Sequence, residues 1–151
     1  MKGMTLIVRT VTDFVVGFIV VFGAYIVLYG HLTPGGGFAG GVIVACAFIL
    51  LLLAHGGDVA YSKLPERVGH LLDSSGALAF LAIAWFGLIG GYFFMNVLGK
   101  GEPFHLFSSG SILAYNIAIA FKVGSSLFLV FAALATFRRR SFRAMIEDEL
   151  L

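Results

Sequence analysis

Lys122 is the residue whose position in this sequence most strongly suggests chemistry. It lies eleven residues into an apolar run that begins at Ser111. A helix rises about 1.5 Å per residue, so Lys122 would lie roughly 16 Å along it, near the midplane of a bilayer. A cation at that depth costs on the order of 3 kcal/mol or more, which makes an ionisable residue there a candidate functional site. Tyr115, Ser125 and Ser126 share its predicted helix face and could hydrogen-bond it or hold water.

Two functions for Lys122 remain open from the sequence. Because burial disfavours an ammonium ion, a buried lysine could lose its proton and act in a proton relay. Alternatively, the lysine could lie at an interface and pair with a carboxylate of a neighbouring subunit.

Asp13 is the one carboxylate predicted within the first apolar run, and Arg9 precedes it by one helical turn. The favoured prediction is an ion pair between these two residues at the membrane boundary. The alternative is an entry group for Na⁺ or H⁺, in which Thr10 and Thr12 offer further oxygens.

The four histidines are all predicted at helix ends or in loops. His31 and His105 could form a proton antenna on the outer side, with Glu102 close to His105, because histidine titrates near neutral pH. Interfacial anchoring or a hydrogen bond between the two loops is the favoured interpretation. His55 and His70 flank the inner loop, and we assign them no role beyond the collection of protons.

The sequence offers no catalytic, cofactor-binding or metal-binding set. The histidine positions disfavour a di-haem cytochrome, and a single cysteine, Cys46, gives neither a disulfide nor an iron–sulfur or zinc cluster. Without a nucleophile–base pair the chain is not expected to be an enzyme by itself. A net charge of +2 with 60% hydrophobic residues makes no case for nucleic-acid binding.

This composition, with only 12% charged residues, is that of an integral membrane protein. Four apolar runs approach the about 20 residues that a transmembrane helix needs. We predict an all-α membrane protein with a single domain over 1–151 that consists of two helical hairpins. The four helices are expected at about 11–29, 36–54, 76–98 and 111–136, followed by a basic tail over 137–151. Thr33 and Pro34 are predicted to begin the second helix, and Asp73 with the two following serines the third. Residues 64–72 form either an amphipathic turn on the membrane surface or an extension of the third helix.

Lysine and arginine placement predicts the orientation. They precede the first helix, fall between the second and third, and follow the fourth, whereas the opposite side carries only Lys100. The positive-inside rule then places both termini and the 55–75 loop in the cytoplasm, with the 30–35 and 99–110 loops outside. The expected location is the plasma membrane, which the chain crosses several times.

Glycines crowd the start of the second predicted helix. Two small-residue stripes, Gly36-x-x-x-Gly40 and Gly37-x-x-x-Gly41, follow Gly35. Small residues let helices approach closely in a membrane, so helix packing or a subunit interface is favoured over direct ion binding. The third helix repeats the pattern with Gly87, Gly90 and Gly91.

Two stretches of the first half resemble a known family. Val8-Arg9-Thr10-Val11-Thr12 and Gly30-His31-x-x-Pro34-Gly35-Gly36-Gly37-Phe38-x-Gly40-Gly41 are similar to the B subunit of Mrp-type (Mnh) multisubunit sodium/proton antiporters. Related subunits occur in archaeal membrane-bound hydrogenases and membrane-bound sulfane sulfur reductases. The family's four-helix length matches almost the whole chain, but the specific motif covers only about 8–41. Lys122 departs from the more apolar, Asp-containing stretch of typical antiporter subunits, which favours a respiratory-complex version.

The resemblance implies an accessory membrane subunit of a cation/proton antiport module. Its partners would be the other membrane subunits of a hetero-oligomeric complex and the lipid bilayer, and the large proton-pumping subunits would supply the main activity. Na⁺ and H⁺ would be the transported ions, with no cofactor in this chain. The alternative is a structural scaffold that seals an ion path built by its neighbours, and Lys122 is the residue that distinguishes the two.

Overall fold

The chain is helical throughout its regular structure. A computed structural model describes residues 4–99 and 101–149, with side chains for all of these except 58 and 139–149. Over these residues it contains helices and no strand: α1 (Leu6–Tyr29), α2 (Gly37–His55), α3 (Gly57–Lys63), α4 (Glu66–Phe86), the short 3-10 helix η1 (Gly87–Gly90) and α5 (Ser111–Glu149). Four segments are long and apolar enough to cross a membrane: Leu6–Tyr29, Gly37–His55, Glu66–Gly90 and Ser111–Arg138. The predicted all-helical class with four helices of membrane-spanning length is confirmed.

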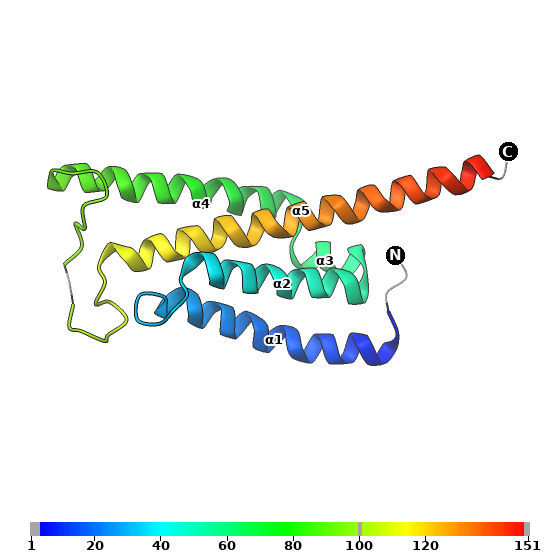
Figure 1. Ribbon diagram of the computed structural model, residues 1–151, viewed down its shortest axis with the longest axis horizontal. Coiled ribbons are helices and arrows are strands. Elements are labelled where there is room, and N and C mark those ends of the chain that lie inside the picture. The colour runs from blue at the N-terminus through cyan, green and yellow to red at the C-terminus, as the bar shows by residue number, and fades with distance from the viewer. Residues whose placement is uncertain (1–3, 100, 150–151) are drawn as a thin grey trace.

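The four long helices lie side by side in the order α1, α2, α5, α4 (Figure 1). The helix α5 therefore separates α2 from α4, although these are consecutive long helices along the chain, with only the short α3 between them. The start of α1 and the end of α5 lie at the same end of the molecule, where α5 continues well past the other helices. At this end α3 covers α5, with Ala60 packed against Leu52 and Ala132.

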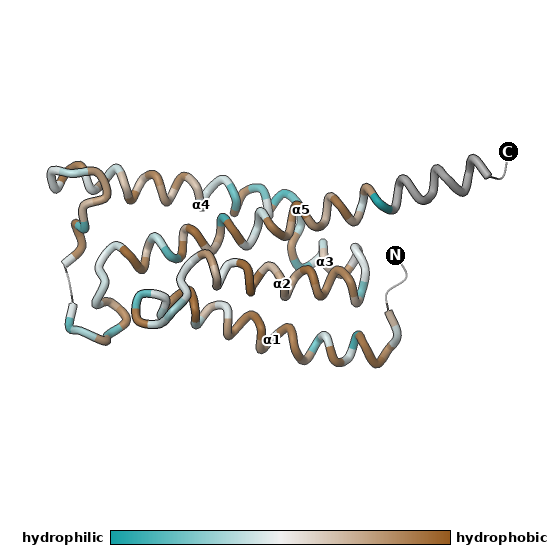
Figure 2. Tube along the Cα trace, viewed as in Figure 1, coloured by the Kyte–Doolittle hydropathy of each residue, from teal (hydrophilic) through white to brown (hydrophobic). Residues whose placement is uncertain are grey.

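Apolar residues make up much of the long helices (Figure 2), and many of their side chains are exposed. On α1, for example, Phe14, Phe18 and Val21 are each at least 63% exposed. In water such a surface would be unfavourable, but it is the surface that lipid or another membrane helix covers. The exposure agrees with a multi-pass membrane protein.

The glycines at the start of α2 face two different helices. A Cβ atom added to Gly41 would lie 2.9 Å from the carbonyl oxygen of Ala120 on α5, and Gly124 lies opposite. Gly37 likewise touches the α5 backbone, whereas Gly40 abuts α1 at Gly23. The two stripes thus let α2 approach α5 on one side and α1 on the other.

The start of α2 differs from the prediction. The helix begins at Gly37, because Thr33 turns its hydroxyl back to the carbonyl oxygen of Tyr29 (3.0 Å) instead of capping α2. Gly35 and Gly36, with φ angles of +151° and +122°, lead into the helix in conformations that favour glycine. The cap comes from α5: the side-chain oxygen of Asn116 accepts a hydrogen bond from the Gly37 amide at 3.2 Å.

The third predicted helix, 76–98, is wrong at both ends. It begins at Glu66 directly after Pro65, so residues 66–72 extend the helix and Asp73 lies inside it rather than at its cap. It ends in η1, and Gly91 (φ +115°) lets the chain fold back. Gly87 lies against the backbone of this returning segment. The glycines 87, 90 and 91 therefore end the helix instead of forming a packing stripe along it.

The fourth predicted helix begins at Ser111, as expected, but continues to Glu149 through the predicted basic tail. The side-chain oxygen of Asn96 accepts hydrogen bonds from both the amide and the hydroxyl of Ser111, each at 3.0 Å. This satisfies one of the free N–H groups at the start of α5.

We predict that Gly76→Ala destabilises the protein by about 1–3 kcal/mol. A Cβ atom there would lie 2.8 Å from the carbonyl oxygen of Ala118 and 2.8 Å from the amide nitrogen of Lys122, so α4 and α5 must separate. The matched control is Gly17→Ala on α1, where nothing lies within 4 Å and the better helix propensity of alanine applies. Thermal unfolding of the detergent-solubilised protein measures both. Equal stability of the two variants would contradict the close approach.

Asn116→Ala should cost about 1 kcal/mol, because the Gly37 amide loses its cap. Asn116→Asp keeps an acceptor oxygen and adds a negative charge at a helix N-terminus, so it should retain most of the stability. The same unfolding measurement compares the two variants. A similar loss in both would show that the amide's shape, not its acceptor oxygen, holds the two helices together.

Candidate functional site

Lys122 pairs with a carboxylate of the same chain. Its ammonium nitrogen donates to Oδ1 of Asp73 on α4, and the hydroxyl of Ser126 donates to the same oxygen. The Lys122 side chain is 44% exposed and that of Asp73 26%. Both residues lie inside candidate membrane spans. The three side chains form what we call the Lys122 cluster.

Two glycines let α4 come close enough to α5 for this pairing. Gly69 and Gly76 lie four residues before and three residues after Asp73, on the same helix face. Gly76 touches the α5 backbone at Ala118 and Lys122, and Gly69 touches Leu129. Because α4 and α5 nearly touch at Gly76, the short aspartate side chain reaches Lys122 across the seam.

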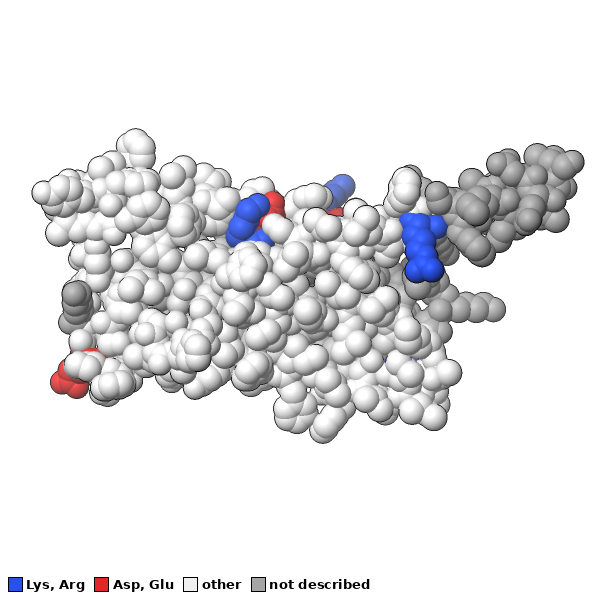
Figure 3. Space-filling view, viewed as in Figure 1, with Lys and Arg blue, Asp and Glu red and all other residues white. Residues whose placement is uncertain are grey.

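The Lys122 cluster is a polar point on an otherwise apolar surface. Figure 3 shows basic and acidic atoms side by side over the middle of α4 and α5, on a face that carries few other charges. In a bilayer each charge alone would be costly, and pairing lowers that cost. Chemically, the cluster combines an acceptor that H⁺ or a hard cation such as Na⁺ could occupy with an ammonium group that competes for it.

Tyr115 and Ser125 share the face of Lys122 but do not contact its ammonium group. The Ser125 hydroxyl donates to the carbonyl oxygens of Phe121 (2.6 Å) and Lys122 (3.2 Å) within α5. The Tyr115 ring packs against Phe80 with ring centroids 5.1 Å apart, and its buried hydroxyl has no partner among the residues that the structure describes. Of Tyr115, Ser125 and Ser126, only Ser126 contacts Asp73, the residue that pairs with Lys122.

Asp13 binds a residue of α2 instead of Arg9. One of its oxygens lies 3.3 Å from Nε2 of His55, whose side chain is 14% exposed. No Arg9–Asp13 ion pair is present among the described side chains, so the predicted pairing within α1 is wrong. The close packing of α1 on α2 brings the last turn of α2 next to Asp13. Residue spacing within α1 alone could not predict this contact.

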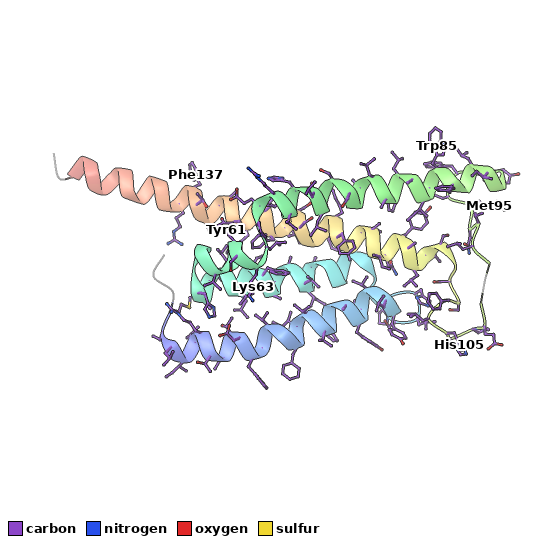
Figure 4. The ribbon with its side chains drawn as sticks, turned by 180° about the vertical axis from the view of Figure 1, so that it is seen from behind. Tyr61, Lys63, Trp85, Met95, His105 and Phe137 are labelled. Atoms are coloured by element: carbon purple, nitrogen blue, oxygen red, sulfur yellow. The ribbon has the colours of Figure 1, made fainter. Side chains whose placement is uncertain are left out.

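The two loops at the other end of the bundle touch through the predicted histidines. Nε2 of His31 lies 3.4 Å from the carbonyl oxygen of His105, and His105 lies 3.6 Å from Glu102. Figure 4 shows His105 at the end of the molecule opposite Lys63. The His105 side chain is 71% exposed. A hydrogen bond between these loops is one of the two arrangements that the sequence favours, beside interfacial anchoring.

Sequence reasoning missed Asp73 and His55 as partners of Lys122 and Asp13. The two serines after Asp73 predict a helix cap, although Gly69 and Gly76 flank Asp73 at the spacing of one helix face. That spacing is the signal that could have placed it at a helix contact. Among the side chains that the structure describes, residues 4–57, 59–99 and 101–138, no group of three or more histidine, cysteine, aspartate or glutamate residues could hold a metal ion.

Comparisons with known proteins agree with the resemblance in the first half of the chain. Residues 7–129 match the family described as a domain related to the MnhB subunit of Na⁺/H⁺ antiporter. An uncharacterised protein of Methanocaldococcus jannaschii is 36% identical over 118 residues, which cover 72% of this chain and 44% of that protein. A protein of Staphylococcus aureus (strain Newman) named as an antiporter subunit, mnhB2, is 45% identical over 65 residues, 43% of this chain and 46% of that protein.

A solved structure shares the fold. A chain in the structure of the membrane-bound sulfane sulfur reductase, an archaeal respiratory membrane complex, superposes with a TM-score of 0.70 and 29% identity, over 85% of this chain and 59% of that chain. The present chain spans 44% and 46% of the two curated relatives, less than half of each. Since the family match runs from the first turn of α1 to the middle of α5, the chain belongs to the family of domains related to the MnhB subunit of Na⁺/H⁺ antiporters.

Proposed function

We propose that this chain is an accessory membrane subunit of an Mrp-type antiport module and contributes to Na⁺/H⁺ translocation within a multisubunit complex. The family match supports the antiport module. The Lys122 cluster is the observation that carries the ion-handling role, because it sets a lysine, a carboxylate and a hydroxyl together inside two membrane spans. Na⁺ and H⁺ are the transported ions of the complex, and this chain itself holds no cofactor and catalyses no reaction.

The cluster supplies the chemistry of exchange. When H⁺ or Na⁺ binds the Asp73 carboxylate, the attraction for the Lys122 ammonium weakens and the pair opens. When the cation leaves, the pair closes again. The Ser126 hydroxyl, which contacts the same carboxylate oxygen, offers a further oxygen ligand to a bound cation. Lys122 thus displaces the ion from Asp73 and limits how long the ion stays.

The partners are the other membrane subunits of the complex. The likeness to a chain of the sulfane sulfur reductase complex supports a place in a respiratory assembly of that kind. The likeness to an antiporter subunit of Staphylococcus aureus supports a place in a standalone antiporter. The arginines near the start of α1 and the end of α5 favour a cytoplasmic position for this end of the bundle in the plasma membrane.

A structural scaffold is the second candidate function. The glycine contacts that join α2 to α1 and α5 favour it, because they give a rigid helical layer without any ion binding. In that case the Lys122 cluster only holds α4 on α5, and neighbouring subunits handle the ions.

Lys122→Met and Asp73→Asn are the variants that separate the two functions. We expect either to abolish most Na⁺-dependent proton transport in vesicles that hold the complete complex, because each leaves the other group of the pair without its partner. Removal of one partner leaves the other charge uncompensated within the membrane span, so subunit composition and assembly are checked first on native gels. Transport at the wild-type rate in both fully assembled variants would make the chain a scaffold.

Two neighbouring serines give a matched test of the cluster. Ser126→Ala removes a hydroxyl that contacts Asp73, whereas Ser125→Ala removes one that bonds only to backbone oxygens of α5. We expect Ser126→Ala to raise the apparent KM for Na⁺ by about tenfold, the effect of roughly 1.4 kcal/mol, and Ser125→Ala to leave it unchanged. Vesicle transport at a series of Na⁺ concentrations measures both. A raised KM for Na⁺ in Ser125→Ala but not in Ser126→Ala would show that Ser126 plays no part in ion binding.

A further inference from the structure

This chain leaves part of its own ion pair uncovered. The Lys122 side chain is 44% exposed in the isolated subunit, at a depth where lipid tails would surround it. Its ammonium group has three hydrogens to donate. Asp73 is the one acceptor recorded for it among the described side chains. Because lipid tails offer no acceptor, a group outside this chain must meet the remaining donors.

The surface around the pair has the shape and composition of a helix contact. Asp73, Ala77 and Leu81 follow one another at i, i+4 and i+8 on α4, as do Lys122, Ser126 and Val130 on α5. We call these six residues the ion-pair face. Leu81 is 53% exposed and Val130 59%, so apolar groups lie on both sides of the polar centre. The ion-pair face is elongated, with the ion pair in the middle and apolar residues at both ends. Another transmembrane helix can cover such a surface along its whole length, whereas a lipid head group would cover only the ion pair.

We propose that the ion-pair face docks a transmembrane helix of a partner subunit and that this helix places an oxygen acceptor opposite Lys122. A helix satisfies its own backbone hydrogen bonds in the bilayer, and the small Ala77 lets it approach closely. A lipid tail on the same face would leave the ammonium donors unmet. The inference rests on the proposed function in one respect, since it requires that the chain belongs to a multisubunit complex.

Photo-crosslinking in the purified, assembled complex tests this contact. The photoreactive residue p-benzoylphenylalanine replaces Leu81 on the ion-pair face. In a control it replaces Phe86, which is 61% exposed and about 140° further round α4. We expect Leu81→p-benzoylphenylalanine to crosslink to another membrane subunit of the complex. Crosslinking from position 81 to lipid alone, or to nothing, would overturn the proposal.

The dependence on Lys122 shows whether the partner helix meets the ammonium group. In complexes with a full set of subunits, Lys122→Met should lower the crosslink yield from position 81 by about fivefold, the effect of one lost hydrogen bond of ordinary strength. Lys122→Arg keeps a cationic donor and should retain the yield, and the yield from position 86 should not respond to either change. Equal yields from position 81 with lysine and methionine would overturn the role of Lys122 in docking.

Transport measured on the same complexes separates this inference from the proposed function. A crosslink that depends on Lys122, with transport that does not, would support the docked helix and overturn the ion-handling role. Transport that depends on Lys122, with lipid as the only crosslinked species at position 81, would support ion handling and overturn the docked helix.

Discussion

The pairing of Lys122 with Asp73 inside an apolar seam is the constraint on which the α4–α5 half of the molecule depends. Neither charge would be tolerated alone at this depth, and each needs the other within hydrogen-bond distance. An aspartate side chain is short, so the two helix backbones must nearly touch beside it. Gly76 allows that approach, because any Cβ atom there would meet the backbone of α5. The ion pair can therefore form only where a residue without a side chain, here Gly76, lets the two helix backbones come together.

The helix α5 lies between α2 and α4 because glycines on both of these helices let their backbones approach it closely. It meets α4 at Gly76 and α2 at Gly37 and Gly41. Lipid gives no hydrophobic force between helices, so such close contacts and the few polar bonds across them supply the association. The Asn116–Gly37 hydrogen bond is one of these, and it ties the start of α2 to α5 rather than to its own loop. The glycine-rich start of α2 is thus the place where α1, α2 and α5 meet.

The membrane class and the number of spans could be predicted because apolar runs are a local property of the sequence. The ends of the helices could not, as the third span shows. Asp73 and the serines after it have the composition of a helix cap, and only a partner 49 residues away makes an aspartate acceptable in the middle of this membrane span. Likewise Asp13 and Arg9 have ideal spacing on one helix, yet His55 of α2 provides the contact. In each case the partner of the aspartate lies on another helix, and the residue spacing within one helix cannot predict such a contact.

A purely structural role explains the glycines of this chain better than it explains the charges. An ion pair removed from water contributes little to stability, and a pair of well-packed apolar residues of similar size would hold α4 on α5 at least as well. The seam already has Gly69 and Gly76 for close packing and needs no charge to close. What a lysine and a carboxylate add, and apolar residues cannot, is a site whose occupancy by a proton or cation changes the pairing. Stability alone would therefore have favoured an uncharged seam, and the charged pair is what the proposed ion-handling role would require.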